Sequence, residues 1–345
     1  MKAVWLRTNN PEREVWRYLS LFSNKSYIDK LVKEKAKDQI VSCVRQATEF
    51  YSLSKSASIL TKPILLYYGM QRLAKALIFL KNPDVNVNDL RNHGLSGAGI
   101  SDKIDEFLRS KIQKTRRGIF NEFCRLTTRN YALLKRIVYT EQDYHSVVNW
   151  IHECNIEDFL NATEFNVRDL FSLVPELFDL FDFLKMEDNL LISCTSLSIR
   201  ERPNGKLDHL LKVEKKIDLD LLKRKFPNIG KYAEFNEESN EFRIVSRLTD
   251  ELMIPNPLVQ SETKDLFLIS STNDSTRMSD INVHYVLMFF LCYVTRYKAP
   301  LFQRIMESDK MSGLIEKFIE VSETKFPKLI LDELTGQYIT FELLG

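Results

Sequence analysis

The sequence predicts a mainly α fold with a small α+β insert at about residues 190–270 and C-terminal helices that return to the helical bundle. Glycine and proline are scarce, with 10 of each among 345 residues, whereas a β-sandwich or barrel needs a turn signal every ~8–12 residues. Apolar residues recur at helical spacing over much of the chain. We therefore expect a helical domain over residues 1–188, the insert over 189–275, and the returning helices over 276–345.

The first part of the chain is expected to contain three helices. Residues 11–60 have the apolar spacing of two helices, and Pro11 suits a first helical turn. A third helix is expected over residues 62–80, again with a proline, Pro63, in its first turn. Because this third segment is apolar on nearly all sides, it should be a central, buried helix.

Weaker patterns follow up to residue 188. The expected elements are, in chain order, a polar loop over 82–101, a helix over 104–112 that Gly118 ends, an ambiguous stretch over 121–160 that is helical in parts, and two short helices over 165–184 separated at Pro175. These segments are shorter and less periodic than the first three.

The pattern changes after residue 188. Alternating apolar residues and β-branched residues indicate strands over 190–201, 209–217, 242–246 and 266–270. Asn204-Gly205 is a hairpin signal between the first two strands, and residues 218–226 are interpreted as a helix. After residue 282 the expected elements are helices over 283–307 and 312–323, a last helix after Pro327, and a terminal strand over 337–343.

Composition excludes several classes of protein. The net charge of +2 gives no bulk attraction to nucleic acid or to an anionic membrane. The longest apolar run, residues 286–294, is far shorter than the ~20 residues that span a bilayer. The five cysteines form no CxxC pair, which argues against disulfides or structural zinc. No phosphate-binding glycine loop or zinc-protease motif is present. We expect a cytoplasmic protein with no membrane partner, no cofactor and no metal.

The strongest candidate for chemistry is the trio Arg91, Asn92 and His93, which precedes a run of glycines. An imidazole can act as a general base or acid near neutral pH. A guanidinium can hold a phosphate or stabilise an oxyanion. We predict these three as catalytic residues. The alternative is structural, with Asn92 and His93 capping a helix and fixing a loop.

Two further groups support this site. Lys111, Lys114 and Arg117 recur at helical spacing and are predicted to bind nucleic acid, because a shared basic face attracts phosphates; the alternative is a solvated helix face. Tyr67, Tyr68 and Lys75 lie in the buried helix and are assigned a supporting role. Buried tyrosine hydroxyls need a polar partner, which His93 or Arg91 could provide, although these groups could equally serve only the core.

The chain resembles the YaaC-like family of bacterial proteins. The resemblance is sharp at Lys62–Met70, Leu73, Lys75-Ala76, His93–Ser96, Lys111–Lys114 and Gly118–Phe120. It is looser in the C-terminal half, where it is carried by Val174–Leu177, Tyr285, Leu287, Tyr293, Arg296-Tyr297 and Lys325–Pro327. The family itself implies little about function.

The same region is similar to the helical core of HEPN domains, through Tyr67-Tyr68-Gly69, Lys75–Leu77 and His93-Gly94. This resemblance implies a HEPN-like helical bundle, frequent dimerisation, and ribonuclease activity in toxin–antitoxin and phage-defence systems. In the usual active motif, several residues separate an Arg-polar pair from the His. Here His93 follows Arg91 and Asn92 directly, which is a departure from that motif.

These observations leave three hypotheses. The first is an RNA-directed, metal-independent ribonuclease of a bacterial stress or phage-defence system. The second is a non-catalytic interaction or regulatory subunit of a multi-protein defence complex. The third is a small-molecule or nucleotide sensor that uses the glycine-flanked loop as an anion pocket. The expected partners are RNA and either another protein or a second copy of the chain.

Overall fold

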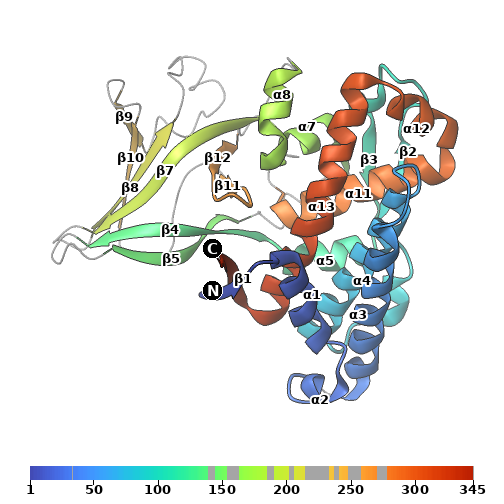
Figure 1. The fold of residues 1–345 in the computed structure, drawn as a ribbon, viewed down its shortest axis with the longest axis horizontal. Helices are drawn as coiled ribbons and strands as arrows, with labels where there is room; N and C mark the ends of the chain where they lie inside the picture. The colour runs from blue at the N-terminus through green and yellow to red at the C-terminus, as the bar shows by residue number, and fades with distance from the viewer. Residues whose placement is uncertain are drawn as a thin grey trace.

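The computed structural model describes residues 1–32, 34–138, 144–153, 163–184, 190–201, 206–213, 233–236, 241–247, 258–269 and 278–344. Within these residues a helical body carries the core, and a sheet extends from one side of it (Figure 1). The helices are α1 (Pro11–Leu21), α2 (Lys25–Ile28), α3 (Glu34–Ser54), α4 (Lys62–Lys81), α5 (Ile119–Leu126), α7 (Val167–Ser172), α8 (Phe178–Phe183), α11 (Asp280–Tyr297), α12 (Ala299–Met306) and α13 (Asp309–Thr335). The expectation of a mainly α protein is confirmed.

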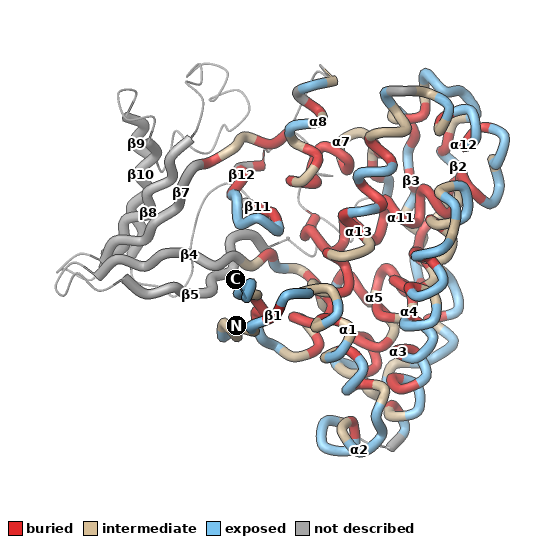
Figure 2. The backbone as a smooth tube through the Cα atoms, in the orientation of Figure 1, coloured by how far each residue is buried: buried red, intermediate tan, exposed pale blue. Residues whose placement is uncertain are grey.

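The helix α4 lies at the centre of the body, as its all-round apolar sequence predicts. It contacts α3, α5, α11 and α13, and Leu66, Met70 and Leu73 are completely buried. Figure 2 shows buried backbone along the inner faces of these helices. The same core continues into α11, which is buried along most of its length. The C-terminal helices therefore pack directly on the central helix.

The boundaries of the C-terminal helices differ from the expectation. The single helix expected over 283–307 is two helices, because α11 ends at Tyr297 and Pro300 lies in the first turn of α12. The break expected near Pro327 is absent, and α13 runs through it from Asp309 to Thr335. A proline removes one helical hydrogen bond, but the fully buried Phe326 and Ile330 hold the helix on both sides of it.

The helix expected over residues 104–112 is wrong. This segment forms a short 3-10 helix, η2 (Phe107–Arg109), and a strand, β3 (Lys111–Lys114). The strand pairs with β2 (Leu95–Gly99) and β6 (Glu164–Asn166) in a three-stranded sheet. In β3 only Ile112 is fully buried, between two exposed neighbours, which is the alternation of a strand. Lys111, Lys114 and Arg117 therefore share no helix face.

The sheet is larger than the expected insert. In the stretch expected to be helical in parts, the described residues form the antiparallel strands β4 (Arg129–Val138) and β5 (Tyr144–Glu153), while α5 supplies the helical part. β4 also pairs in parallel with a strand over residues 191–201, so β4 and β5 join the eight-stranded sheet. Its other strands are β7 (Leu191–Glu201), β8 (Lys206–Val213), β9 (Ala233–Asn236), β10 (Glu241–Arg247), β11 (Leu258–Gln260) and β12 (Leu266–Ile269).

Most strand predictions are confirmed by β7, β8, β10 and β12. The hairpin signal Asn204-Gly205 and the helix expected over 218–226 lie outside the described residues, although the antiparallel pairing of β7 with β8 agrees with a hairpin. The two short helices around Pro175 are present as α7 and α8, with the 3-10 helix η3 (Pro175–Leu177) between them. The division of the chain into three domains stays a prediction.

The two ends of the chain pair with each other. The expected terminal strand is β13 (Gln337–Leu343), and it forms a parallel ladder with β1 (Lys2–Thr8), with Lys2 opposite Gln337. An ion pair of 2.9 Å between Arg7 Nε and Glu342 Oε2 lies on the same ribbon. Figure 1 shows both ends beside α1 and the C-terminal part of α13. Among the helices of the described residues, none is long and apolar enough to span a membrane.

The contact between α3 and α4 gives a first testable prediction. A Cβ at Gly69 would come within 2.7 Å of the ring of Tyr51, which is buried and packs on Trp16. Gly69→Ala should therefore lower the free energy of unfolding by about 1–3 kcal/mol through overpacking. Gly313→Ala is the matched control, because no atom lies within 4 Å of its Cβ, and it should stabilise α13 by about 0.5–1 kcal/mol. Chemical denaturation measures both, and equal effects would contradict the packing argument.

Candidate functional site at His93

The loop that carries His93 is fixed by the start of α5. The backbone N–H groups of Ile119 and Phe120 donate to the carbonyl oxygens of Asn92 and His93, both at 3.0 Å. Gly94 has φ +83°, a conformation that favours glycine. A Cβ at Gly118 would lie 2.3 Å from the Gly94 nitrogen, so the two glycine backbones pack directly on each other. Gly118 was expected to end a helix. It instead precedes the first residue of α5, and its backbone contacts the His93 loop.

The His93 side chain faces α4. Its Nδ1 lies 2.9 Å from the hydroxyl of Tyr67 and 2.8 Å from Nε2 of Gln71, which are one turn apart on that helix. Its ring packs between Tyr67 and Phe289, with ring centroids 5.5 and 5.9 Å away. None of the hydrogen bonds among the described residues uses His93 Nε2. That nitrogen is therefore the one available to another molecule.

The charge state of His93 is set by its surroundings. Burial lowers the pKa of the imidazole below its ordinary value, and the positive charges of Arg296 and Lys75 lower it further. The pKa of Lys75 is also lowered, first by burial and then by the neighbouring Arg72. His93 is therefore a neutral imidazole at pH 7, and Lys75 gives up its proton more readily than an ordinary lysine. A pair of this kind can perform acid–base chemistry.

Two half-buried tyrosine rings, one exposed tyrosine ring and an exposed guanidinium lie beside this histidine. We call Tyr68, Tyr293, Arg296 and Tyr297 the aromatic–basic surface. Arg296 Nη1 donates to the Tyr68 hydroxyl at 2.8 Å, and its guanidinium lies 4.9 Å from the centroid of the Tyr297 ring. The Tyr293 and Tyr297 rings pack at 4.8 Å, and Tyr297 is 62% exposed. These contacts hold the guanidinium over an aromatic face by cation–π attraction while leaving it open to solvent.

The structure brings together only part of the predicted site. Tyr67 contacts His93, Tyr68 binds Arg296, and Lys75 lies close enough to His93 to affect its charge. Arg91 and Asn92 are exposed, and among the described residues no hydrogen bond or ion pair joins either side chain to His93. The catalytic assignment of the trio therefore stays a prediction, with His93 separated from its two sequence neighbours.

The predicted nucleic-acid-binding residues are dispersed. Lys111 forms an ion pair with Glu164 on the neighbouring strand. Lys114 is half-buried, and burial lowers its pKa. Arg117 is exposed on the turn before α5, next to the His93 loop. Both Lys114, which pairs with Leu95, and Arg117, which precedes Gly118, are on segments that contact the His93 loop.

Sequence reasoning did not assign a role to Gln71, Phe289, Arg296 or Tyr297. Gln71 looks like an ordinary polar residue of an apolar helix, and its role depends on a contact 22 residues away. Arg296 and Tyr297 stand at the end of the apolar helix α11, three and four residues after Tyr293. A basic residue between two tyrosines at the polar end of a buried helix is the one signal that could have pointed to this surface.

Comparison with known proteins identifies a protein family that matches this chain. The family model described as "YaaC-like Protein" matches residues 12–334, nearly the whole chain. No curated protein is significantly similar to it. No solved structure is significantly similar either.

The electrostatics of this site give a second prediction. The pKa of His93, followed by NMR titration of its ring protons, should lie below 6.5. Arg296→Gln removes a nearby positive charge and should raise that pKa, though not fully to 6.5, because burial remains. Arg304→Gln on α12 is the control, since it changes the same charge on an exposed residue that does not affect His93. A wild-type pKa above 6.5 would contradict the described environment.

Proposed function

We propose that this chain, which belongs to the YaaC-like family, binds single-stranded RNA at the aromatic–basic surface and cleaves it at His93 without a metal ion. The observation that carries the proposal is Arg296, held against the exposed Tyr297 ring beside a neutral imidazole. Proteins bind single strands by combining cationic groups for the phosphates with aromatic rings on which bases stack. This surface offers both within reach of an acid–base group.

The reaction would follow from the chemistry of RNA itself. His93, through Nε2, takes the proton of a ribose 2′-hydroxyl, and the resulting oxygen attacks the adjacent phosphorus. Arg296 stabilises the negative charge that develops on the phosphate oxygens. Lys75 donates a proton to the departing 5′-oxygen. The products are a 2′,3′-cyclic phosphate and a 5′-hydroxyl, and the reaction needs no metal ion.

The biological setting belongs to the same proposal. The sequence of α4 and of the His93 loop is similar to that of HEPN domains, and this resemblance implies a stress or phage-defence system. The chain would then be an RNA-directed effector of that system. The local charges agree with such a role, because Arg91, Arg116 and Arg117 are exposed on two loops joined by backbone hydrogen bonds near His93.

A second candidate is a non-catalytic interaction or regulatory subunit. The observation that favours it is the position of Arg91 and Asn92, which are exposed and make no described polar contact with His93. In this case the aromatic–basic surface binds RNA without cleaving it, or binds another protein or a second copy of the chain. The two candidates differ in one measurable property, the dependence of RNA cleavage on His93.

The proposal predicts the behaviour of three variants with labelled single-stranded RNA at constant salt. Tyr297→Ala should weaken binding by about tenfold or more, because one base–aromatic stack contributes about 1–3 kcal/mol. Arg296→Ala should weaken both binding and cleavage. His93→Ala should bind RNA as the wild type does but abolish cleavage, and EDTA should have no effect.

The control for this experiment is Arg304→Ala, an exposed arginine on α12 outside the surface. It should match the wild type in fluorescence anisotropy and in gel-based cleavage assays. Binding that Tyr297→Ala leaves unchanged would overturn the RNA proposal. Binding without cleavage by the wild type, or cleavage by His93→Ala at the wild-type rate, would instead favour the non-catalytic subunit.

A further inference from the structure

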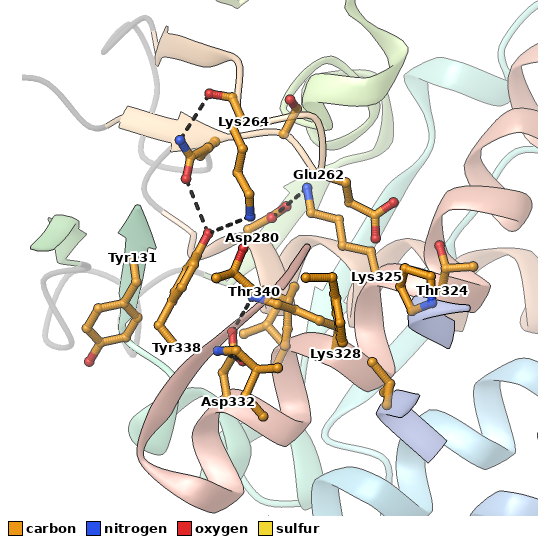
Figure 3. A pocket seen from close by; sticks show the side chains of 18 of the residues that line it. Tyr131, Glu262, Lys264, Asp280, Thr324, Lys325, Lys328, Asp332, Tyr338 and Thr340 are labelled. Atoms are coloured by element: carbon orange, nitrogen blue, oxygen red, sulfur yellow. Dashed lines mark hydrogen bonds and ion pairs between the residues drawn. The ribbon is translucent and has the colours of Figure 1, made fainter. Parts of the chain in front are cut away.

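A second site lies apart from His93, in a cavity of about 530 Å³. The cavity is formed by α13, β13, the start of α1, the start of β4, and the turn between β11 and β12 (Figure 3). Its volume is within the range of cavities that hold small molecules, about 300–1,000 Å³. Its lining includes apolar and aromatic side chains such as Tyr131, Ile281, Leu329 and Phe341. None of its lining residues belongs to the His93 site.

The lysines of this cavity are already engaged. Lys325 Nζ lies 2.8 Å from Asp280 Oδ2 and 2.8 Å from Glu176 Oε1. Lys328 forms an ion pair with Asp332 and lies over the Tyr338 ring at 4.0 Å. Burial alone would lower the pKa of Lys325, but Asp280 and Glu176 raise it above its ordinary value. Lys325 therefore stays an ammonium ion and is neither a nucleophile nor a free anion site.

The third lysine of the cavity, Lys264, is also bound to another residue of the lining. Lys264 Nζ donates to the Tyr338 hydroxyl at 3.3 Å, and that hydroxyl donates to Gln260 Oε1 at 3.3 Å. Lys264 has φ +75°, a left-handed conformation that costs energy for a lysine. Lys264 has this conformation in the turn between β11 and β12, where its side chain contacts Tyr338. Figure 3 shows Lys264 pointing toward Tyr338 across the cavity wall.

Two carboxylates of the lining have no such partner. Among the described residues, no hydrogen bond or ion pair involves the carboxylate of Glu262 or that of Glu333. Burial raises the pKa of Glu333 to about 7, although Lys81, Arg129 and the N-terminal amine act in the opposite direction. Glu262 is an exposed residue of the lining, and partial burial raises the pKa of its carboxyl. The nearby Lys325 ammonium and His284 act in the opposite direction, whereas Glu176 and Asp280 raise the pKa further. Both groups would be stabilised in their charged form by a cation.

The two carboxylates stand at different levels of the cavity. The backbone N–H of Glu262 donates at 3.0 Å to Glu176, the residue that pairs with Lys325, so Glu262 lies at the Lys325 level of α13. Glu333 follows Lys325 by eight residues on the same helix, which is on the order of 12 Å along the axis. An occupant that satisfies both carboxylates must therefore be elongated and positively charged at both ends.

We infer that the cavity binds a linear diamine or polyamine, with one terminal ammonium group at Glu262, the other at Glu333, and the aliphatic chain against the apolar wall. A metal ion does not fit, because no cluster of three or more metal-ligating side chains occurs in the part of the chain that the structure describes. An anion does not fit because the cavity lysines are engaged. The inference is independent of the RNA proposal, since it uses none of the same residues.

Isothermal titration calorimetry of the full chain with spermidine tests this assignment. Spermidine should bind and raise the melting temperature, whereas 1,3-diaminopropane, which is too short to reach both carboxylates, should bind at least tenfold more weakly. Glu262→Gln and Glu333→Gln should each weaken spermidine binding about tenfold or more, because each removes one charged hydrogen-bond partner of about 1.5–3 kcal/mol. Glu316→Gln, an exposed carboxylate on α13, is the matched control and should change nothing.

Three results would overturn the assignment. One is equal loss of binding in Glu316→Gln, which would mean unspecific attraction to surface charge. Another is equal affinity for the short diamine. The third is stabilisation by inorganic phosphate with no response to spermidine, which would mean that the cavity selects anions. RNA binding at the aromatic–basic surface is unaffected by any of these results, so the two proposals fail independently.

The titration of Glu333 adds a pH-dependent prediction. The groups that influence it are Lys81 on α4, Asp332 on α13, Arg129 on β4 and the N-terminal amine. Spermidine affinity should fall as the pH is lowered from 8 to 6, because Glu333 takes up a proton near pH 7. Glu333→Gln should weaken this dependence, and an unchanged pH profile in that variant would contradict the role of Glu333.

The same group affects stability without ligand. The unfolded chain releases this proton near pH 4.5, and the folded chain releases it only near pH 7. The folded state therefore loses stability as the pH rises between these values and does not regain it above them. Glu333→Gln should accordingly raise the melting temperature at pH 8 and have a smaller effect at pH 4.5, as measured by calorimetry. A lower melting temperature at pH 8 would contradict the burial of this carboxyl.

Discussion

The rest of the helical body depends on the burial of Tyr67. Its side chain is 1% exposed, and its ring contacts those of His93, Tyr285 and Phe289. One residue of α4 thus joins α11 to the loop that precedes β2. A tyrosine in the core needs a polar partner for its hydroxyl, and His93 Nδ1 provides it at 2.9 Å. The demand for hydrogen bonding inside the core therefore fixes the orientation of the imidazole and leaves its other nitrogen available.

The sequence predicted the elements that depend on neighbouring residues and missed those that depend on contacts between distant parts of the chain. The position of α4, the strands β7, β12 and β13, and the break at Pro175 followed from periodicity and turn residues. The strand β3 was missed because it is only four residues long and because its partner β6 is distant in sequence, beginning at Glu164. Gly118 was interpreted as the end of a helix because its backbone contact with Gly94 cannot be recognised from the sequence. For the same reason His93 was found, but Arg296, about 200 residues away, was not.

Charge is placed in this protein by local structure rather than by overall composition, since the net charge is only +2. Lys325 on α13 is buried between Asp280 at the start of α11 and Glu176 on η3. Behind it, His284 Nδ1 lies 2.6 Å from Ser322 Oγ and Nε2 lies 3.5 Å from Asp280 Oδ1. Such buried ions contribute little net stability, but removing one partner leaves a charge uncompensated at a cost of about 3–5 kcal/mol. This network of ion pairs and hydrogen bonds joins α13, α11 and η3 at the end of the cavity where Lys325 lies.

The pairing of β1 with β13 has a consequence for synthesis. Arg7 and Glu342 on these strands are 335 positions apart, so the ladder can close only after nearly all of the described chain exists. Contacts over such separations are slow to form because a very large loop must be closed. Tyr338, Ile339 and Phe341 of β13 line the cavity. A nascent chain still missing β13 can therefore complete its central helices on the ribosome while its second site does not yet exist.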